Sequence, residues 1–155
     1  MYKKLGILSL SVLLAACAAP KYTAEAISEG DQSQEITIVE DNATREIFLD
    51  SMQEWCLDTA HKCSVVRDGT PPKESELTLI YVSRWSWDFK TFIADAKVKA
   101  YKNSKKVGEV EFKALNNQNS TKWGNDNKRI MAMMDLLFGR LTVSEAQSKM
   151  KSGEM

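Results

Sequence analysis

The sequence predicts a single α+β domain, with a mostly antiparallel sheet of about five strands and two main helices packed on one face. Three observations lead to this prediction. A β-branched run at residues 36–39 precedes a stretch of helical periodicity, the spacing of apolar residues then changes to two between residues 77 and 114, and a second helical pattern occupies residues 130–141.

The first helix is predicted from about Ala43 to Thr59, with Asn42 or Thr44 placed to cap it. Its apolar residues recur at helical spacing and are Ile47, Phe48, Met52, Trp55 and Cys56. A second short strand is expected at 63–66, and the Asp-Gly and Pro-Pro pairs that follow predict a loop.

The first long strand is predicted from a strict alternation that begins at Leu77. One of its faces carries Leu77, Leu79, Tyr81, Ser83, Trp85, Trp87 and Phe89. Because a soluble domain rarely leaves so broad an apolar patch in water, we expect the aromatic members of this face to form the centre of the core. They would pack beneath Ile47 and Phe48 of the first helix and Leu137 and Phe138 of the last.

Two further strands are predicted at 92–101 and 106–114, joined by a turn, with a bulge where the alternation slips at Gly108. The polar, Asn-rich segment 116–127 predicts a long surface loop. Gly139 suits the end of the closing helix, and Thr142-Val-Ser-Glu145 has the spacing of a capping box that opens a short terminal helix.

The first 16 residues have the pattern of an export signal, with two lysines before an apolar run too short to span a membrane. The segment Leu14-Ala15-Ala16-Cys17 resembles the lipobox of bacterial lipoproteins. This resemblance implies that the Cys17 thiol receives a diacylglycerol, that the preceding peptide is removed, and that the new amino terminus is acylated, for example with palmitate. Ala18 stands where an aspartate would imply retention at the inner membrane, so the resemblance implies sorting to the outer membrane. An ordinary secretory signal with an incidental cysteine is the alternative.

We therefore expect a signal peptide at 1–16, a lipidated Cys17 with a flexible tether at 17–34, one domain at 35–150 and a frayed tail at 151–155. Cleavage would remove two lysines from a chain of net charge zero and leave a charge of about −2. Lysines and acidic residues are interspersed, so the sequence predicts no nucleic-acid partner. Membrane attachment would depend on the lipid.

Cys56 and Cys63 are the remaining cysteines, and exported proteins normally pair such residues. Seven residues span about 10 Å on a continuous helix, more than the roughly 7 Å that a disulfide tolerates, so the helix must end between them. A redox role, or a metal site that includes His61, the only histidine, is the weaker alternative. We predict a structural disulfide, no metal site and no cofactor.

Trp85, Trp87 and Asp88 are the candidate binding residues, because they lie in the densest aromatic segment of the chain. If this face is exposed, the indoles could stack on sugar rings or hold a partner protein. The alternation favours a place in the core. Asp88 with Asp95 could form a carboxylate pair, but no second motif supports an enzyme, so no catalytic residue is predicted.

The string Tyr81-x3-Trp85-x-Trp87-Asp88 is followed by Ala94 and Ala96, Val107-Gly108-Glu109 and Leu136-Leu137-Phe138-Gly139. This pattern resembles a family of small, uncharacterised Gram-negative envelope lipoproteins, over most of residues 77–139. The resemblance implies an anchored domain in the cell envelope and carries over no catalytic residue.

Together these features predict a non-enzymatic interaction or assembly module on the outer membrane. It would be anchored by lipid, would face the periplasm, and would bind an unknown envelope protein. A glycan- or peptidoglycan-binding module that uses Trp85 and Trp87 is the first alternative, and an envelope hydrolase is the second. The solvent exposure of the two indoles discriminates between a binding surface and a core.

Overall fold

The computed structural model describes residues 18–155, so the predicted signal peptide and the predicted lipid attachment at Cys17 lie outside the described residues. The elements in chain order are β1 (Lys21–Glu25), β2 (Glu35–Val39), α1 (Glu46–Asp58), β3 (Lys62–Val66), β4 (Leu77–Asp88), β5 (Lys90–Lys102), β6 (Lys105–Lys113), the 3-10 helix η1 (Ser120–Trp123), α2 (Asp126–Leu137) and α3 (Val143–Lys151). Within this described part, no helix is long and apolar enough to cross a membrane.

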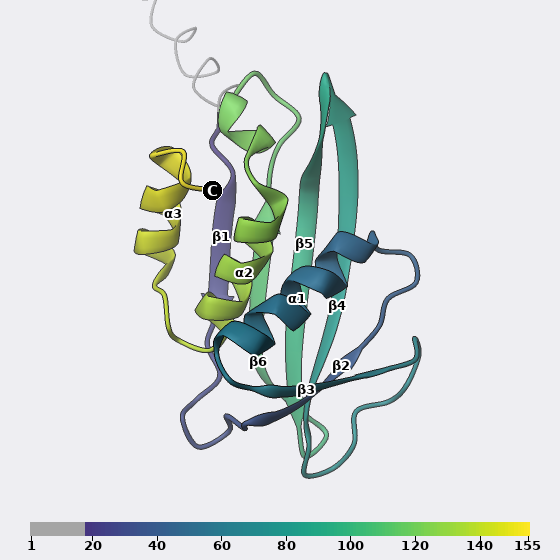
Figure 1. Cartoon of the computed structure of the whole chain (residues 1–155). Helices are drawn as coiled ribbons and strands as arrows, with labels where there is room; N and C mark the ends of the chain where they lie inside the picture. The colour runs from purple at the N-terminus through teal and green to yellow at the C-terminus, as the bar shows by residue number, and fades with distance from the viewer. Residues whose placement is uncertain (1–17) are drawn as a thin grey trace, which may run out of the picture.

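One mixed sheet of six strands organises the molecule, in the order β1-β6-β5-β4-β2-β3 (Figure 1). The β1–β6, β6–β5 and β5–β4 pairs are antiparallel, whereas β2 runs parallel to both β3 and β4. The parallel β2–β3 pair follows from the helical crossover through α1. The predicted α+β class is confirmed, the expected short terminal helix is present as α3, and the structure adds a sixth strand and parallel pairing on one side of the sheet.

The segment predicted as a flexible tether is partly a strand. β1 pairs with β6 over its whole length, and the ring centres of Tyr22 and Phe112 lie 4.9 Å apart. The buried residue Ile27 donates its amide hydrogen to the carbonyl of Leu137 (2.8 Å). The tether prediction is therefore wrong for this segment, and the domain begins before residue 35. The sequence has no alternating apolar pattern here, because β1 lies at the sheet edge and buries only one side chain in five.

The predicted disulfide is confirmed: it joins Cys56 in the last turn of α1 to Cys63 in β3, with Cα atoms 6.1 Å apart. The helix ends at Asp58, and Ala60 adopts a left-handed conformation with φ 58° that reverses the chain. The helix therefore does end between the two cysteines, as their spacing requires.

The start of α1 differs from the prediction. Its N-cap residue is Arg45, and no side chain caps the first turn, so the prediction that Asn42 or Thr44 caps the helix is wrong. The Thr44 hydroxyl instead accepts a hydrogen bond from the amide of Ser83 (2.9 Å). This bond ties the loop before α1 to the middle of β4.

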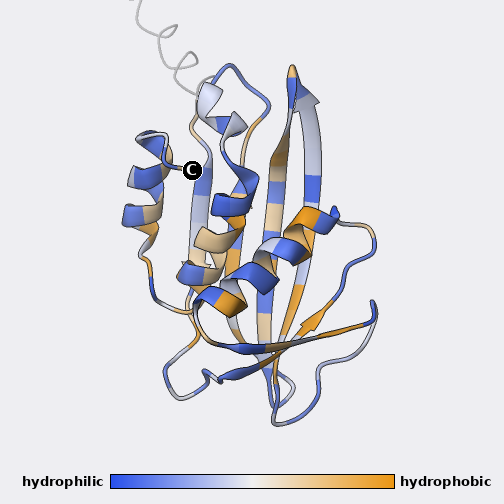
Figure 2. Ribbon diagram, viewed as in Figure 1, coloured by the Kyte–Doolittle hydropathy of each residue, from blue (hydrophilic) through white to orange (hydrophobic). Residues whose placement is uncertain are grey.

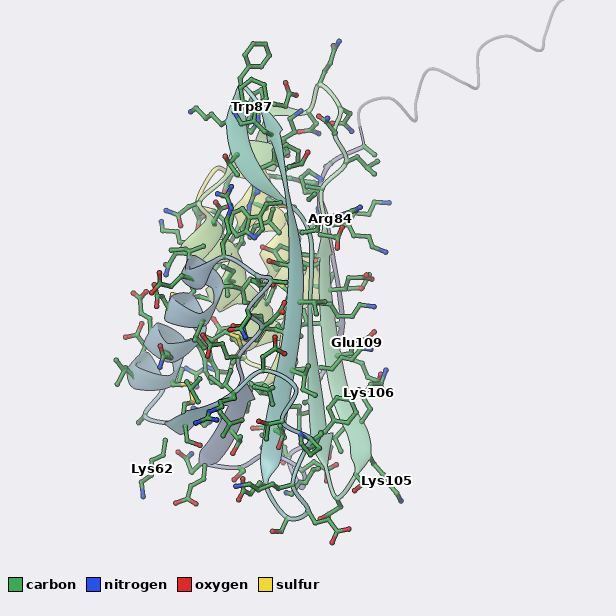
Figure 3. The ribbon with its side chains drawn as sticks, turned by 90° about the vertical axis from the view of Figure 1, so that its right-hand side faces the viewer. Lys62, Arg84, Trp87, Lys105, Lys106 and Glu109 are labelled. Carbon is green, nitrogen blue, oxygen red and sulfur yellow. A yellow bond between two sulfur atoms is a disulfide. The ribbon has the colours of Figure 1, made fainter. Side chains whose placement is uncertain are left out.

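The helices cover one face of the sheet and leave the other face open (Figure 1, Figure 3). Hydrophobic and hydrophilic residues alternate along β4 and β5, as Figure 2 shows. Between the helices, the buried indole of Trp55 donates to Asp135 Oδ1 (2.8 Å) and packs against Phe138, with ring centres 4.7 Å apart. The open face carries partly exposed ion pairs such as Lys97–Glu111 (3.5 Å).

The turn between β5 and β6 and the bulge near Gly108 are both confirmed. Asn103 and Ser104 have φ values of 50° and 61°, which suit a tight hairpin turn. The register shifts so that Val107 has no partner on β5. Gly108 allows a close approach, since a Cβ built there would lie 2.8 Å from Cγ1 of Ile27.

The ends of α2 and α3 follow local rules. Asn125 caps α2 by accepting from the amide of Lys128 (2.9 Å), and Gly139 follows the helix with φ 67°. The capping box of Thr142 and Glu145 is confirmed at the start of α3. The prediction of a frayed tail is wrong for Met155, which is buried.

Replacing both Cys56 and Cys63 with alanine should lower the free energy of unfolding by about 2–3 kcal/mol, because the bridge restricts the unfolded chain. Urea denaturation measures this change. Dithiothreitol should destabilise the wild-type protein by a similar amount and leave the double variant unchanged. Two free thiols in protein isolated from cells would contradict the prediction.

Candidate functional site

The side chains on the aromatic face of β4 are buried at Tyr81 and become exposed to solvent towards the end of the strand. Tyr81 is buried and stacks on Phe48, with ring centres 4.9 Å apart. Trp85 is half-buried, donates its indole hydrogen to Ser83 Oγ (2.9 Å) and lies beneath the guanidinium of Arg45, 4.9 Å from the ring centre. Beyond Trp85 the face is no longer covered.

Trp87 and Phe89 are 70% and 82% exposed, so the prediction that they form the centre of the core is wrong. The physical reason is the length of the strands. α1 begins at Glu46, next to the Arg45 that covers Trp85, while β4 and β5 continue past the helical layer to their turn. Figure 3 shows Trp87 at the extreme end of the sheet. Ile47, predicted to pack over this face, is 39% exposed.

Phe89 is the residue between β4 and β5, and it has a φ of 59°. A bulky side chain in this left-handed region is uncommon, and such strained residues cluster at functional sites. The Phe89 ring meets Trp123 of η1 edge-on, with ring centres 6.5 Å apart. We call the residues Trp87, Phe89 and Trp123 the aromatic end of the domain.

A buried lysine, which the sequence did not indicate, lies beneath the aromatic end. Lys122 has a side chain only 1% exposed, although it belongs to the segment predicted as a surface loop. Its ammonium group forms an ion pair with Asp88 and donates to the carbonyl of Asn117 and to Asn116 Oδ1 (3.3 Å). The carboxylate of Asp88, the third predicted binding residue, is therefore engaged from within the protein.

Aromatic rings complete the surroundings of this ammonium group. Lys122 Nζ lies 4.9 Å from the ring centre of Trp123 and 5.4 Å from that of Phe92. Ring faces attract cations more strongly when water is excluded. The lysine thereby joins η1 to the turn between β4 and β5.

The same interactions reach the beginning of the described chain. Asn117, whose carbonyl accepts from Lys122, donates its side-chain amide to the carbonyl of Ala18 (2.9 Å). Gln147 of α3 donates to the carbonyl of Pro20 (2.5 Å). Residues 18–20 are therefore held against the same end of the domain as Trp87 and Phe89.

Arg129 supports η1 from the interior. This fully buried side chain donates to the carbonyls of Lys122 (2.6 Å) and Thr121, and its guanidinium lies 5.2 Å from the ring centre of Phe112. Burial lowers the pKa of Arg129 and raises the pKa of the nearby Asp126 carboxyl. The backbone that presents Lys122 and Trp123 is thus bonded to Arg129 through two consecutive carbonyls.

Of the residues predicted as sites, Trp87 and Asp88 lie at the aromatic end of the domain. The disulfide lies away from them, at the opposite end of α1 from Arg45. His61 lies near the disulfide, where burial, followed by the charge of Arg140, lowers its pKa. No group of three or more metal-binding side chains occurs among residues 18–155.

Compared with known proteins, the chain matches no family model and no curated protein.

Substituting Trp87 with alanine should lower the free energy of unfolding by less than about 1 kcal/mol, because most of its ring is in water. Trp55→Ala should lower it by about 3–5 kcal/mol, since that ring is buried between the helices. Denaturation midpoints of both variants measure the difference. Losses of equal size would show that Trp87 belongs to the core after all.

Replacing Lys122 with methionine should lower the free energy of unfolding by about 3 kcal/mol, because Asp88 loses the ammonium group that pairs with it. Lys122→Met combined with Asp88→Asn should cost less than the sum of the two single changes. Lys90→Met is the matched control at an exposed lysine, and it should cost less than about 0.5 kcal/mol. Strictly additive effects in the double variant would exclude a coupling between Lys122 and Asp88.

Proposed function

We propose that this protein is an outer-membrane lipoprotein, anchored through an acylated Cys17, that acts without catalysis as a contact module of the cell envelope. The lipobox-like sequence supports the anchor. The observation that carries the contact function is the exposed aromatic end, because Trp87 and Phe89 are large apolar side chains held in water by an ordered turn.

The aromatic end has the properties of a binding surface. Tryptophan dominates the energetics of interfaces, and a prearranged side chain loses little conformational freedom on binding. The buried pair of Lys122 and Asp88 supports such prearrangement, because it bonds the turn to η1. The predicted envelope partner would meet the domain at this end.

A glycan-binding module remains the second candidate, and the exposure of Trp87 favours it. The version that uses two indoles loses support, because Arg45 covers the ring of Trp85. The hydrolase alternative, which depends on Asp88, stays an untested prediction; the carboxylate of Asp88 already pairs with Lys122.

Two measurements test the proposed function. Mass spectrometry of the mature amino terminus should find an acylated Cys17; an unmodified Cys17, or Met1 retained, would overturn the anchor. A photoreactive residue placed at Phe89 in living cells should then form adducts with an envelope component. The matched control is the same residue at Val65, which is 37% exposed on the edge strand β3. Equal labelling from both positions would overturn the assignment of the contact surface.

A further inference from the structure

We propose that the component contacted by the aromatic end is the bilayer that holds the Cys17 lipid. Trp87 and Phe89 enter the headgroup region, and the domain stands on the membrane with the β4–β5 turn towards it. This inference rests on the proposed function, because it requires the lipid at Cys17. It adds the chemistry of the partner and the orientation of the domain.

No linker residue separates the proposed anchor at Cys17 from the part of the chain that is bonded to the domain. Cys17 is bonded directly to Ala18, whose carbonyl is held by Asn117, and Pro20 and Tyr22 are buried. Consecutive Cα atoms lie about 3.8 Å apart, so the residue that carries the lipid is directly next to one that is bonded to the domain. A long tether would allow every orientation of the domain, whereas this attachment restricts it to those that keep Ala18 at the membrane.

The second argument is the direction of the strands. One row of paired residues crosses the sheet from β1 to β4. It consists of Lys21, Lys113, Asp95 and Arg84, and Lys21 is the first residue of β1. β1 runs away from the β4–β5 turn, so residues 18–20 precede it on the side of the turn (Figure 1). Trp87 lies three residues beyond Arg84, about 10 Å along the strand. The attachment point and the aromatic end therefore face the same way.

The third argument is chemical. Tryptophan is enriched at the boundary between headgroups and acyl chains, where its apolar ring and polar N–H are both satisfied. Asp88 is the only acidic residue between Trp85 and Phe92, and it pairs with Lys122, while Lys90 is exposed. The turn therefore presents aromatic rings and positive charge to lipids that carry negative charge.

The position of the anchor favours the bilayer as the occupant, because Ala18 and the β4–β5 turn lie at the same end of the domain. A protein or a glycan could meet the domain on any face, and neither needs its binding surface beside Ala18. A lipid-anchored domain with exposed aromatic rings at the same end as its point of attachment presents those rings towards the membrane.

The test uses the acylated full-length protein, purified from membranes and reconstituted into vesicles of phosphatidylethanolamine and phosphatidylglycerol. In one set of vesicles the acyl chains are brominated near the headgroup, so that they quench nearby indoles. We expect tryptophan emission to fall in the brominated vesicles, and Trp87→Phe to remove at least half of that loss. The variant keeps an aromatic ring at an exposed position, so its folding is not at issue.

The matched control moves the exposed indole to the far end of α1. The double variant Trp87→Phe with Leu57→Trp keeps four tryptophans, and position 57 is 81% exposed. Its emission should be quenched no more than that of Trp87→Phe alone. Quenching of the indole introduced at position 57 as strong as that attributed to Trp87 would overturn the proposed orientation.

The outcomes separate the two proposals. Mass spectrometry that finds no acyl group on Cys17 overturns the proposed function and this inference with it. An acylated protein whose Trp87 is not quenched overturns this inference alone, as do adducts of the Phe89 photoprobe with a protein or a glycan instead of phospholipid. Adducts with phospholipid together with quenching of Trp87 support it.

Discussion

The arrangement of the aromatic end of this domain depends on the interactions of the Lys122 ammonium group. A buried charge is tolerated only when its hydrogen-bonding capacity is used, and this one is shared among a carboxylate, a side-chain amide, a backbone carbonyl and two aromatic rings. Those partners come from the β4–β5 turn, the loop after β6 and η1. The charge therefore joins these segments from the interior, in addition to the contact between Phe89 and Trp123, and Asn117 extends the connection to Ala18.

Several interactions hold this end in place, and they explain how a small domain can present large apolar side chains that no core encloses. The sheet supplies one support, since β4 and β5 pair up to Asp88 opposite Lys90. Arg129 supplies another by bonding the carbonyls of Thr121 and Lys122 in η1. The aromatic rings are thus held from the interior of the domain, which is consistent with the proposed contact function.

Most elements of the fold could be predicted because they follow local rules. The alternation from Leu77 identifies β4 and the face that carries Tyr81, and the cysteine spacing requires the helix to end between Cys56 and Cys63, as it does at Asp58. Other features depend on what lies opposite in space. β1 forms because the edge of β6 is available for pairing, and Trp87 is exposed because the helix that covers β4 begins next to Arg45. Neither feature produces a periodic pattern in the nearby sequence. Lys122 sits in a polar segment whose composition indicates a solvated loop.

The position of β1 also determines when the domain can be completed. Its first residue, Lys21, pairs with Lys113, so the strand next to Cys17 has no partner until β6 has been synthesised. Contacts between residues so distant in sequence form late and slowly, because the intervening chain must first be closed into a loop. In an exported chain, the segment beside Cys17 would remain unpaired through this interval and open to a modifying enzyme. Closure of the sheet would then draw the modified terminus against the finished domain.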